Sequence, residues 1–249
     1  MLAQRRRVPR DASVGARLLI LVLVGVLPAC GARRGETPPS PAPGATVGAL
    51  PPPIGIPSGA QPLAIDPDGS VVRILVYRAG PLARLGHDHV ISSGHETGYA
   101  WIGGTPGESG FEIRLSVADL VIDDPQARRA AGPGFAADVP EDARAGTRRN
   151  LLRAEVLDGT RHPQIVVHAN GLEGDWERPS VAATVQLKDQ VRTIDVPLTI
   201  QREPRAVLAR GEFRLRQSEF GITPFSVAGG AIQVADEVGI TFEIRAVAP

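Results

Sequence analysis

The chain has 249 residues, of which 43% are hydrophobic and 22% are charged, with 27 basic and 27 acidic side chains. This length supports one large domain or two small ones, each with its own hydrophobic core. Residues 1–29 hold five arginines against one aspartate, so the remainder of the chain is mildly acidic. That balance argues against nucleic acid as a partner. The single cysteine excludes an internal disulfide and a cysteine-rich metal site.

Residues 1–29 have the layout of an export signal. A basic stretch ends at Arg17, and residues 18–27 form an apolar run of ten, whereas a membrane-spanning helix needs about 20. A basic segment followed by a short apolar one is typical of a secretory signal. The run ends in Leu27-Pro28-Ala29-Cys30, which resembles the bacterial lipobox. The resemblance implies lipid attachment at Cys30 and cleavage just before it, and a plain signal peptide with an incidental cysteine is the alternative.

Residues 30–62 are predicted to form a disordered tether. Nine prolines lie there among glycine, alanine, serine and threonine, a composition that favours extended chain without a buried face. The folded domain is therefore expected to span residues 63–249. Gly31 stands where some bacteria place an aspartate that retains lipoproteins at the inner membrane, so the outer membrane is the expected site of anchoring.

Beyond the tether, the dominant pattern is period-two alternation. In residues 111–117, Phe111, Ile113 and Leu115 alternate with polar side chains. One solvent-exposed polar face and one buried apolar face are typical of an antiparallel sheet. The same pattern is clean in residues 181–187, 192–200, 210–216 and 240–246, and less regular in residues 71–77, 96–102 and 165–169. Residues 188–190 are predicted to join two of these strands as a hairpin.

A single segment interrupts the period-two alternation. Residues 123–162 are rich in alanine, arginine and aspartate, and residues 141–157 are predicted to form a helix. The excursion over residues 123–157 is expected to cap the barrel opening. The fold class is therefore all-β: a single antiparallel, eight-stranded barrel with one helical excursion, because closure leaves no exposed strand edge. A two-sheet sandwich remains open, since alternation alone does not separate the two.

The order of these features resembles the YceI-like family of bacterial exported proteins, over about residues 63–247. The motifs that carry the resemblance, in chain order, are Ala64-Ile65-Asp66, Phe111-Glu112-Ile113-Arg114-Leu115, Arg149-Asn150-Leu151-Leu152, Arg161-His162-Pro163, Phe220-Gly221 and Asp236-Glu237-Val238-Gly239. The chain departs from the family in residues 187–191, where a hairpin glycine is missing, and in residues 84–90, where the first hairpin is extended.

The resemblance implies a lipocalin-like barrel that binds a polyisoprenoid or another amphiphilic lipid in its lumen. An eight-stranded barrel is wide enough for one slender ligand, and an apolar channel gains about 25 cal/mol for each Å² of hydrocarbon removed from water. In the alternative, the inward side chains pack against one another and leave no cavity. The expected ligand-binding residues are Ile113, Leu115, Val117, Val185, Ile194, Val196, Leu198, Phe213, Leu215, Phe242, Ile244 and His89.

The histidines suggest a rival function. His87 and His89 are two residues apart and would share one face of a strand, so they could ligate a metal ion or a haem iron in a redox module. Such a site needs further ligands that the sequence does not place. A second interpretation is a polar barrel mouth, where His89 hydrogen-bonds a ligand headgroup such as a quinone carbonyl.

Nothing in the sequence favours an enzyme. There is no Gly-x-Ser-x-Gly motif, and the one cysteine lies in the lipobox. The acid pairs Asp123-Asp124 and Glu141-Asp142 are interpreted as solvated charge. The expected protein is a lipid carrier without a cofactor, tethered in the bacterial cell envelope. A third alternative is an adhesive or assembly protein with a filled barrel.

Overall fold

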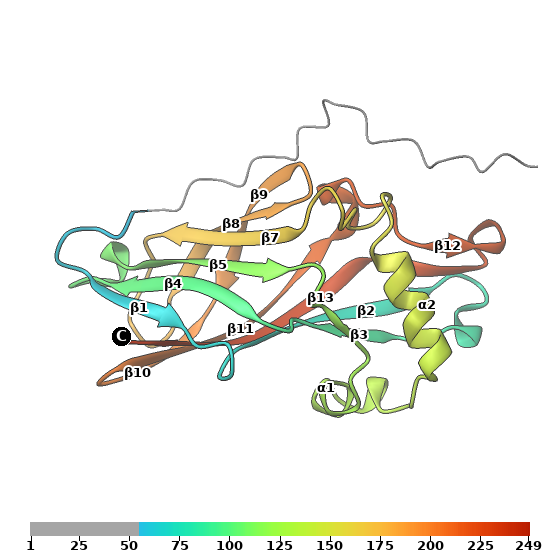
Figure 1. The fold of residues 1–249 in the computed structure, drawn as a ribbon, viewed down its shortest axis with the longest axis horizontal. Helices are drawn as coiled ribbons and strands as arrows, with labels where there is room; N and C mark the ends of the chain where they lie inside the picture. The colour runs from blue at the N-terminus through green and yellow to red at the C-terminus, as the bar shows by residue number, and fades with distance from the viewer. Residues whose placement is uncertain (1–54) are drawn as a thin grey trace, which may run out of the picture. The chain divides into compact units, whose positions relative to one another are not determined.

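The computed structural model describes residues 55–249. These residues form one sheet in which every strand pair is antiparallel (Figure 1). The sheet contains 13 strands. They are β1 (Gln61–Ile65), β2 (Val71–Ala79), β3 (His89–Ser92), β4 (Glu96–Ile102), β5 (Gly110–Ser116), β6 (Val121–Ile122), β7 (Gln164–Asn170), β8 (Ser180–Leu187), β9 (Gln190–Pro197), β10 (Thr199–Glu203), β11 (Ala206–Arg216), β12 (Ser226–Val227) and β13 (Ile232–Val247).

All eight predicted strand segments are strands, and the sheet contains further short strands that the pattern did not predict. The segment 192–200 is divided at Leu198 into β9 and β10. Four further strands, β1, β3, β6 and β12, have between two and five residues, too few for a period-two pattern to stand out. β1 begins at Gln61, two residues before the expected start of the domain, because Gln61 pairs with Ile102 of β4.

The strand ladder closes into a barrel. β13 pairs with β11 on one side and with β1 and β2 on the other. From β1 the ladder continues through β4, β5, β7, β8 and β9. β10 follows β9 after the single residue Leu198 and pairs with β11, which leads back to β13. The antiparallel barrel is therefore confirmed over the sandwich.

The predicted hairpin between β8 and β9 is present. Leu187 pairs with Gln190, so the turn consists of Lys188 and Asp189. Lys188 has a φ of 56°, a left-handed conformation in which glycine is more usual. Its ammonium group donates hydrogen bonds to the carbonyl oxygens of Ala154 (3.0 Å) and Gly221 (3.3 Å). These contacts tie the hairpin to two other loops.

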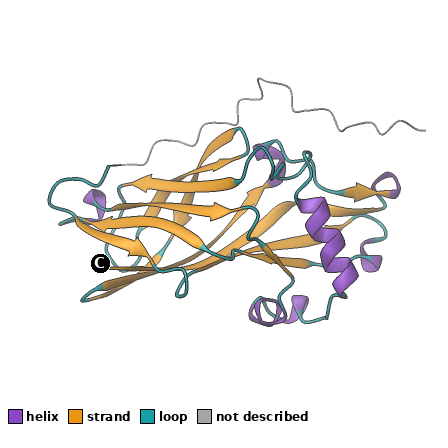
Figure 2. Cartoon of the chain, viewed as in Figure 1, coloured by secondary structure: helices purple, strands orange, loops and turns teal. Residues whose placement is uncertain are grey.

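The helical excursion contains two α-helices, α1 (Pro125–Ala130) and α2 (Glu141–Leu151), which pack near β3 and β6 at the same end of the barrel (Figures 1 and 2). The predicted helix starts at Glu141 but ends at Leu151, not at 157. After Leu152 the chain turns so that Leu157, only 6% exposed, packs in the core beside Phe220. Burial of Leu157 therefore overrides continuation of the helix.

No helix in residues 55–249 is long and apolar enough to cross a membrane. The predicted export signal, Cys30 and most of the predicted tether lie outside the described residues.

Candidate functional site

The barrel encloses two adjacent cavities of about 150 Å³ and 340 Å³. One water molecule needs only about 10–15 Å³, so both cavities are far larger than a packing defect. They share a wall formed by Val72, Leu115, Val167, Val185, Phe213 and Ile240. The inward side chains therefore do not fill the lumen, contrary to the two alternatives that required a filled interior.

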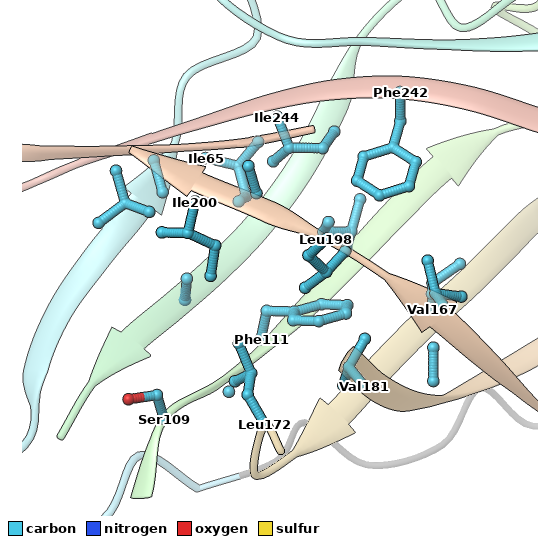
Figure 3. A pocket seen from close by; sticks show the side chains of 18 of the residues that line it. Ile65, Ser109, Phe111, Val167, Leu172, Val181, Leu198, Ile200, Phe242 and Ile244 are labelled. Atoms are coloured by element: carbon cyan, nitrogen blue, oxygen red, sulfur yellow. The ribbon is translucent and has the colours of Figure 1, made fainter. Parts of the chain in front are cut away.

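The smaller cavity, here called the apolar chamber, is walled by aliphatic and aromatic side chains. Phe111 of β5, Phe242 of β13 and Leu198, which lies between β9 and β10, point into it (Figure 3). The two lining residues with polar side-chain atoms use them elsewhere: Ser109 Oγ donates to the Thr105 carbonyl oxygen (3.0 Å), and Trp101 Nε1 donates to that of Glu108 (3.1 Å). The chamber therefore offers a ligand dispersion contacts and burial.

The larger cavity, here called the histidine chamber, combines an apolar wall with a polar end. It lies beside α2, which contributes Ala143, Thr147, Asn150 and Leu151 to its lining. None of its lining residues within 55–249 is an aspartate or a glutamate. Its polar lining residues are Arg78, His87, His89, Thr147, Asn150, Gln217 and Gln233. The lumen is therefore apolar at one end and lined by hydrogen-bonding side chains at the other.

Ten of the twelve predicted ligand-binding residues line the lumen. Those in the apolar chamber are Ile113, Leu115, Val185, Val196, Leu198, Phe213, Phe242 and Ile244, and those in the histidine chamber are His89, Leu115, Val185, Phe213 and Leu215.

The other two predicted residues, Val117 and Ile194, line neither chamber. Val117 lies beyond the end of β5, where its N–H donates to the Pro163 carbonyl oxygen (2.9 Å), and its side chain is buried in the core. Ile194 packs against the buried core clusters and lines neither chamber.

Sequence reasoning offered a polar barrel mouth at His87 and His89 but missed the other polar side chains of this end of the lumen. Arg78, Gln217 and Gln233 come from three distant segments, and no local pattern connects them. A signal did exist in α2, where Ala143, Thr147 and Asn150 are spaced by four and three residues and so share one helical face.

A buried polar network adjoins the histidine chamber. Asp123 is only 1% exposed. Its Oδ1 accepts hydrogen bonds from the Val90 N–H (2.9 Å) and from Nη1 of Arg128 (2.5 Å), and its Oδ2 lies 2.6 Å from Nδ1 of His89. The interpretation of Asp123 as solvated charge is therefore wrong. Asp124 has a separate role, because its carboxylate caps α1 by accepting the N–H groups of residues 126 and 127.

The network favours the ionised form of Asp123. Desolvation by burial acts to raise the pKa of Asp123, but the hydrogen bonds from His89, Val90 and Arg128 outweigh it and hold the pKa below its usual range. The carboxylate is therefore an acceptor on both oxygens.

The geometry does not assemble a metal centre around the two histidines. His87 and His89 both line the histidine chamber, as their spacing predicted, with ring centroids 6.3 Å apart. However, Nδ1 of His89 is engaged by Asp123. Within residues 55–249, no group of three or more His, Cys, Asp or Glu side chains is arranged to hold a metal ion.

Comparison with known proteins agrees with this architecture. The model of the YceI-like domain matches residues 95–246, whereas curated proteins give no match. BcnA of Burkholderia cenocepacia superposes with a TM-score of 0.54 at 14% identity, over 73% of this chain and 98% of that one. A YCEI protein of Campylobacter jejuni gives a TM-score of 0.47 at 10% identity, over 64% and 84%. The family match covers more than half of the chain and falls on the strands that enclose the lumen, so the chain belongs to the YceI-like domain family.

Proposed function

We propose that the protein binds and carries an isoprenoid-type or other amphiphilic lipid in its lumen, without catalysis. The observation that carries the proposal is the apolar chamber, whose few polar side-chain atoms are already bonded within the protein. A hydrocarbon chain gains about 25 cal/mol for each Å² it removes from water there. Transfer of a water molecule into the chamber brings no comparable gain in free energy, because the wall offers it no hydrogen-bond partners.

The second chamber favours an amphiphile over a pure hydrocarbon. It adjoins the apolar chamber across shared residues and ends in hydrogen-bonding side chains. Binding pockets commonly combine an apolar wall with a few polar groups that orient the ligand. A lipid tail in the apolar chamber would place its polar end near His87 and His89. Membership of the YceI-like family, whose resemblance implied a polyisoprenoid ligand, supports the same class.

Organic extraction of the purified full chain, followed by mass spectrometry, tests the proposal. We expect a co-purified lipid near one molecule per protein, and uptake of a fluorescent prenyl probe after delipidation. A protein that holds no lipid and takes up no probe would contradict lipid binding. The metal content of the same sample tests the redox alternative independently.

Anchoring in the cell envelope is a separate part of the proposal. It is supported by Leu27-Pro28-Ala29-Cys30, which resembles a lipobox, and by the proline-rich segment that follows. A chain held by two or three acyl groups would stay at the membrane from which its ligand comes. We expect incorporation of a labelled fatty acid, recovery in the outer membrane, and loss of both in Cys30→Ser. Labelling that persists in this variant would refute the assignment of Cys30.

A further inference from the structure

The inference concerns the chemical nature of the ligand's polar end, and it rests on the proposed function. We propose that His89 accepts a hydrogen bond from a hydroxyl group, so that the lipid is an alcohol or a hydroquinone. The expectation of a quinone carbonyl as the partner of His89 is thereby revised, because a carbonyl oxygen has no proton to donate.

The first step is the state of Nδ1 of His89. Asp123 receives the Arg128 guanidinium and the Val90 N–H on Oδ1, so Nδ1 of His89 faces the remaining oxygen at 2.6 Å. An ionised carboxylate only accepts hydrogen bonds. The proton of this bond must therefore come from His89, which fixes the tautomer with hydrogen on Nδ1.

The second step is the state of Nε2. We take His89 as the neutral imidazole, because Arg128 is already paired with Asp123 and a second cation would add a charge beside a largely apolar chamber. In a neutral imidazole protonated on Nδ1, Nε2 carries a lone pair. Nε2 is the ring nitrogen that does not face Asp123. The His89 side chain is 15% exposed and lines the histidine chamber. No hydrogen bond to Nε2 is formed by residues 55–249.

The third step is the choice among polar headgroups. Arg78 is the one cationic side chain lining this chamber within residues 55–249, and it is already engaged. Its Nη1 donates to the Gly86 carbonyl oxygen (2.9 Å), and its Nε lies 3.6 Å from the Asp88 carboxylate. A phosphate or carboxylate head would therefore compete with an existing ion pair, and it would face the lone pair of Nε2. A hydroxyl group satisfies Nε2, and its oxygen can accept from an amide such as that of Asn150.

A ligand series tests the inference without altering the protein. The delipidated full chain is titrated with a C20 prenyl alcohol, its methyl ether and the corresponding aldehyde, by displacement of a fluorescent prenyl probe. We expect the alcohol to bind about tenfold more tightly than the ether or the aldehyde, the scale of one hydrogen bond whose loss leaves a buried acceptor unpaired. Equal affinities, or a preference for the aldehyde, would overturn the role of His89 while leaving lipid carriage intact. If none of the three displaces the probe, or the probe does not bind, the proposed function itself fails.

A matched pair of variants localises the preference. His89→Phe should remove the discrimination between alcohol and ether. His95→Phe, at an exposed histidine that lines neither chamber, should keep it. The ¹⁵N chemical shifts of His89 in the wild-type protein give a readout that needs no variant: hydrogen on Nε2, alone or together with hydrogen on Nδ1, would contradict the inference.

Discussion

Ala182 and Ala183 are neighbours on β8 whose side chains lie on opposite sides of the barrel wall. Ala183 is 2% exposed and lines the apolar chamber, whereas Ala182 is exposed to solvent. Ala183→Trp should fill the chamber and weaken binding of a fluorescent prenyl probe by at least about tenfold. Overpacking is expected to lower the free energy of unfolding by about 1–3 kcal/mol.

Ala182→Trp is the matched control for this prediction. The same side chain on the outer face should leave probe affinity within about twofold of wild type, with little loss of stability, since exposed substitutions usually change it by no more than about 0.5 kcal/mol. Full binding by a folded Ala183→Trp variant would show that the lipid lies elsewhere.

The buried ion pair between Asp123 and Arg128 predicts a large loss of stability on truncation. Their side chains are 0% and 5% exposed, and Asp123→Ala leaves the guanidinium buried without its carboxylate. Removal of one partner of such a pair costs about 3–5 kcal/mol. Urea denaturation should show this loss, whereas Asp124→Ala, which removes the cap of α1, should cost about 1 kcal/mol. Equal losses in the two variants would argue against the importance of the network.

The lowered pKa of Asp123 predicts an acid-sensitive contribution to stability. Because the carboxylate titrates at a lower pH in the folded protein than in the unfolded chain, where its pKa is near 3.8, its contribution is complete above that value. The contribution disappears as pH falls through the folded-state pKa. The difference in unfolding free energy between wild type and Asp123→Asn should be constant above about pH 5 and narrow below about pH 4. A difference that widens on acidification would contradict the direction of the shift.

Gly98 on β4 is predicted to tolerate no side chain. Its φ is +136°, and an added Cβ would lie 2.0 Å from the carbonyl oxygen of Glu112 on β5. Gly98→Ala should therefore separate β4 from β5 and cost more than about 3 kcal/mol. Gly134→Ala is the control, because nothing lies within 4 Å of that position. Similar melting temperatures for the two variants would show that the sheet adjusts without cost.

The part of the site that could be predicted was the part encoded locally. Alternation along a strand assigns each side chain to one face, so Ile113, Phe213 and Phe242 were correctly placed in the lumen. Val117 is also buried, as alternation predicts, but it lies one residue past the end of β5 and lines neither chamber. Periodicity contains no information on where a strand stops when the next residue is also apolar.

Apart from His87 and His89, the polar end could not be predicted, because it depends on contacts between distant segments. Asp123 lies in a hydrophilic stretch and looks solvated, but its partner Val90 is 33 residues away along the chain. Leu198 shows a second limit of sequence patterns. The alternation of apolar and polar residues continues through Leu198, but β9, which pairs with β8, ends before it, and β10, which pairs with β11, begins after it. Pairing partners, not residue types, decided both outcomes.

The unequal character of the two chambers gives the proposed cargo a direction. A lipid held with its tail in the apolar chamber and its hydroxyl beside His89 would leave through the histidine chamber with its oxygen first. On that route a receiving bilayer or enzyme would meet the hydroxyl group before the hydrocarbon has left the lumen.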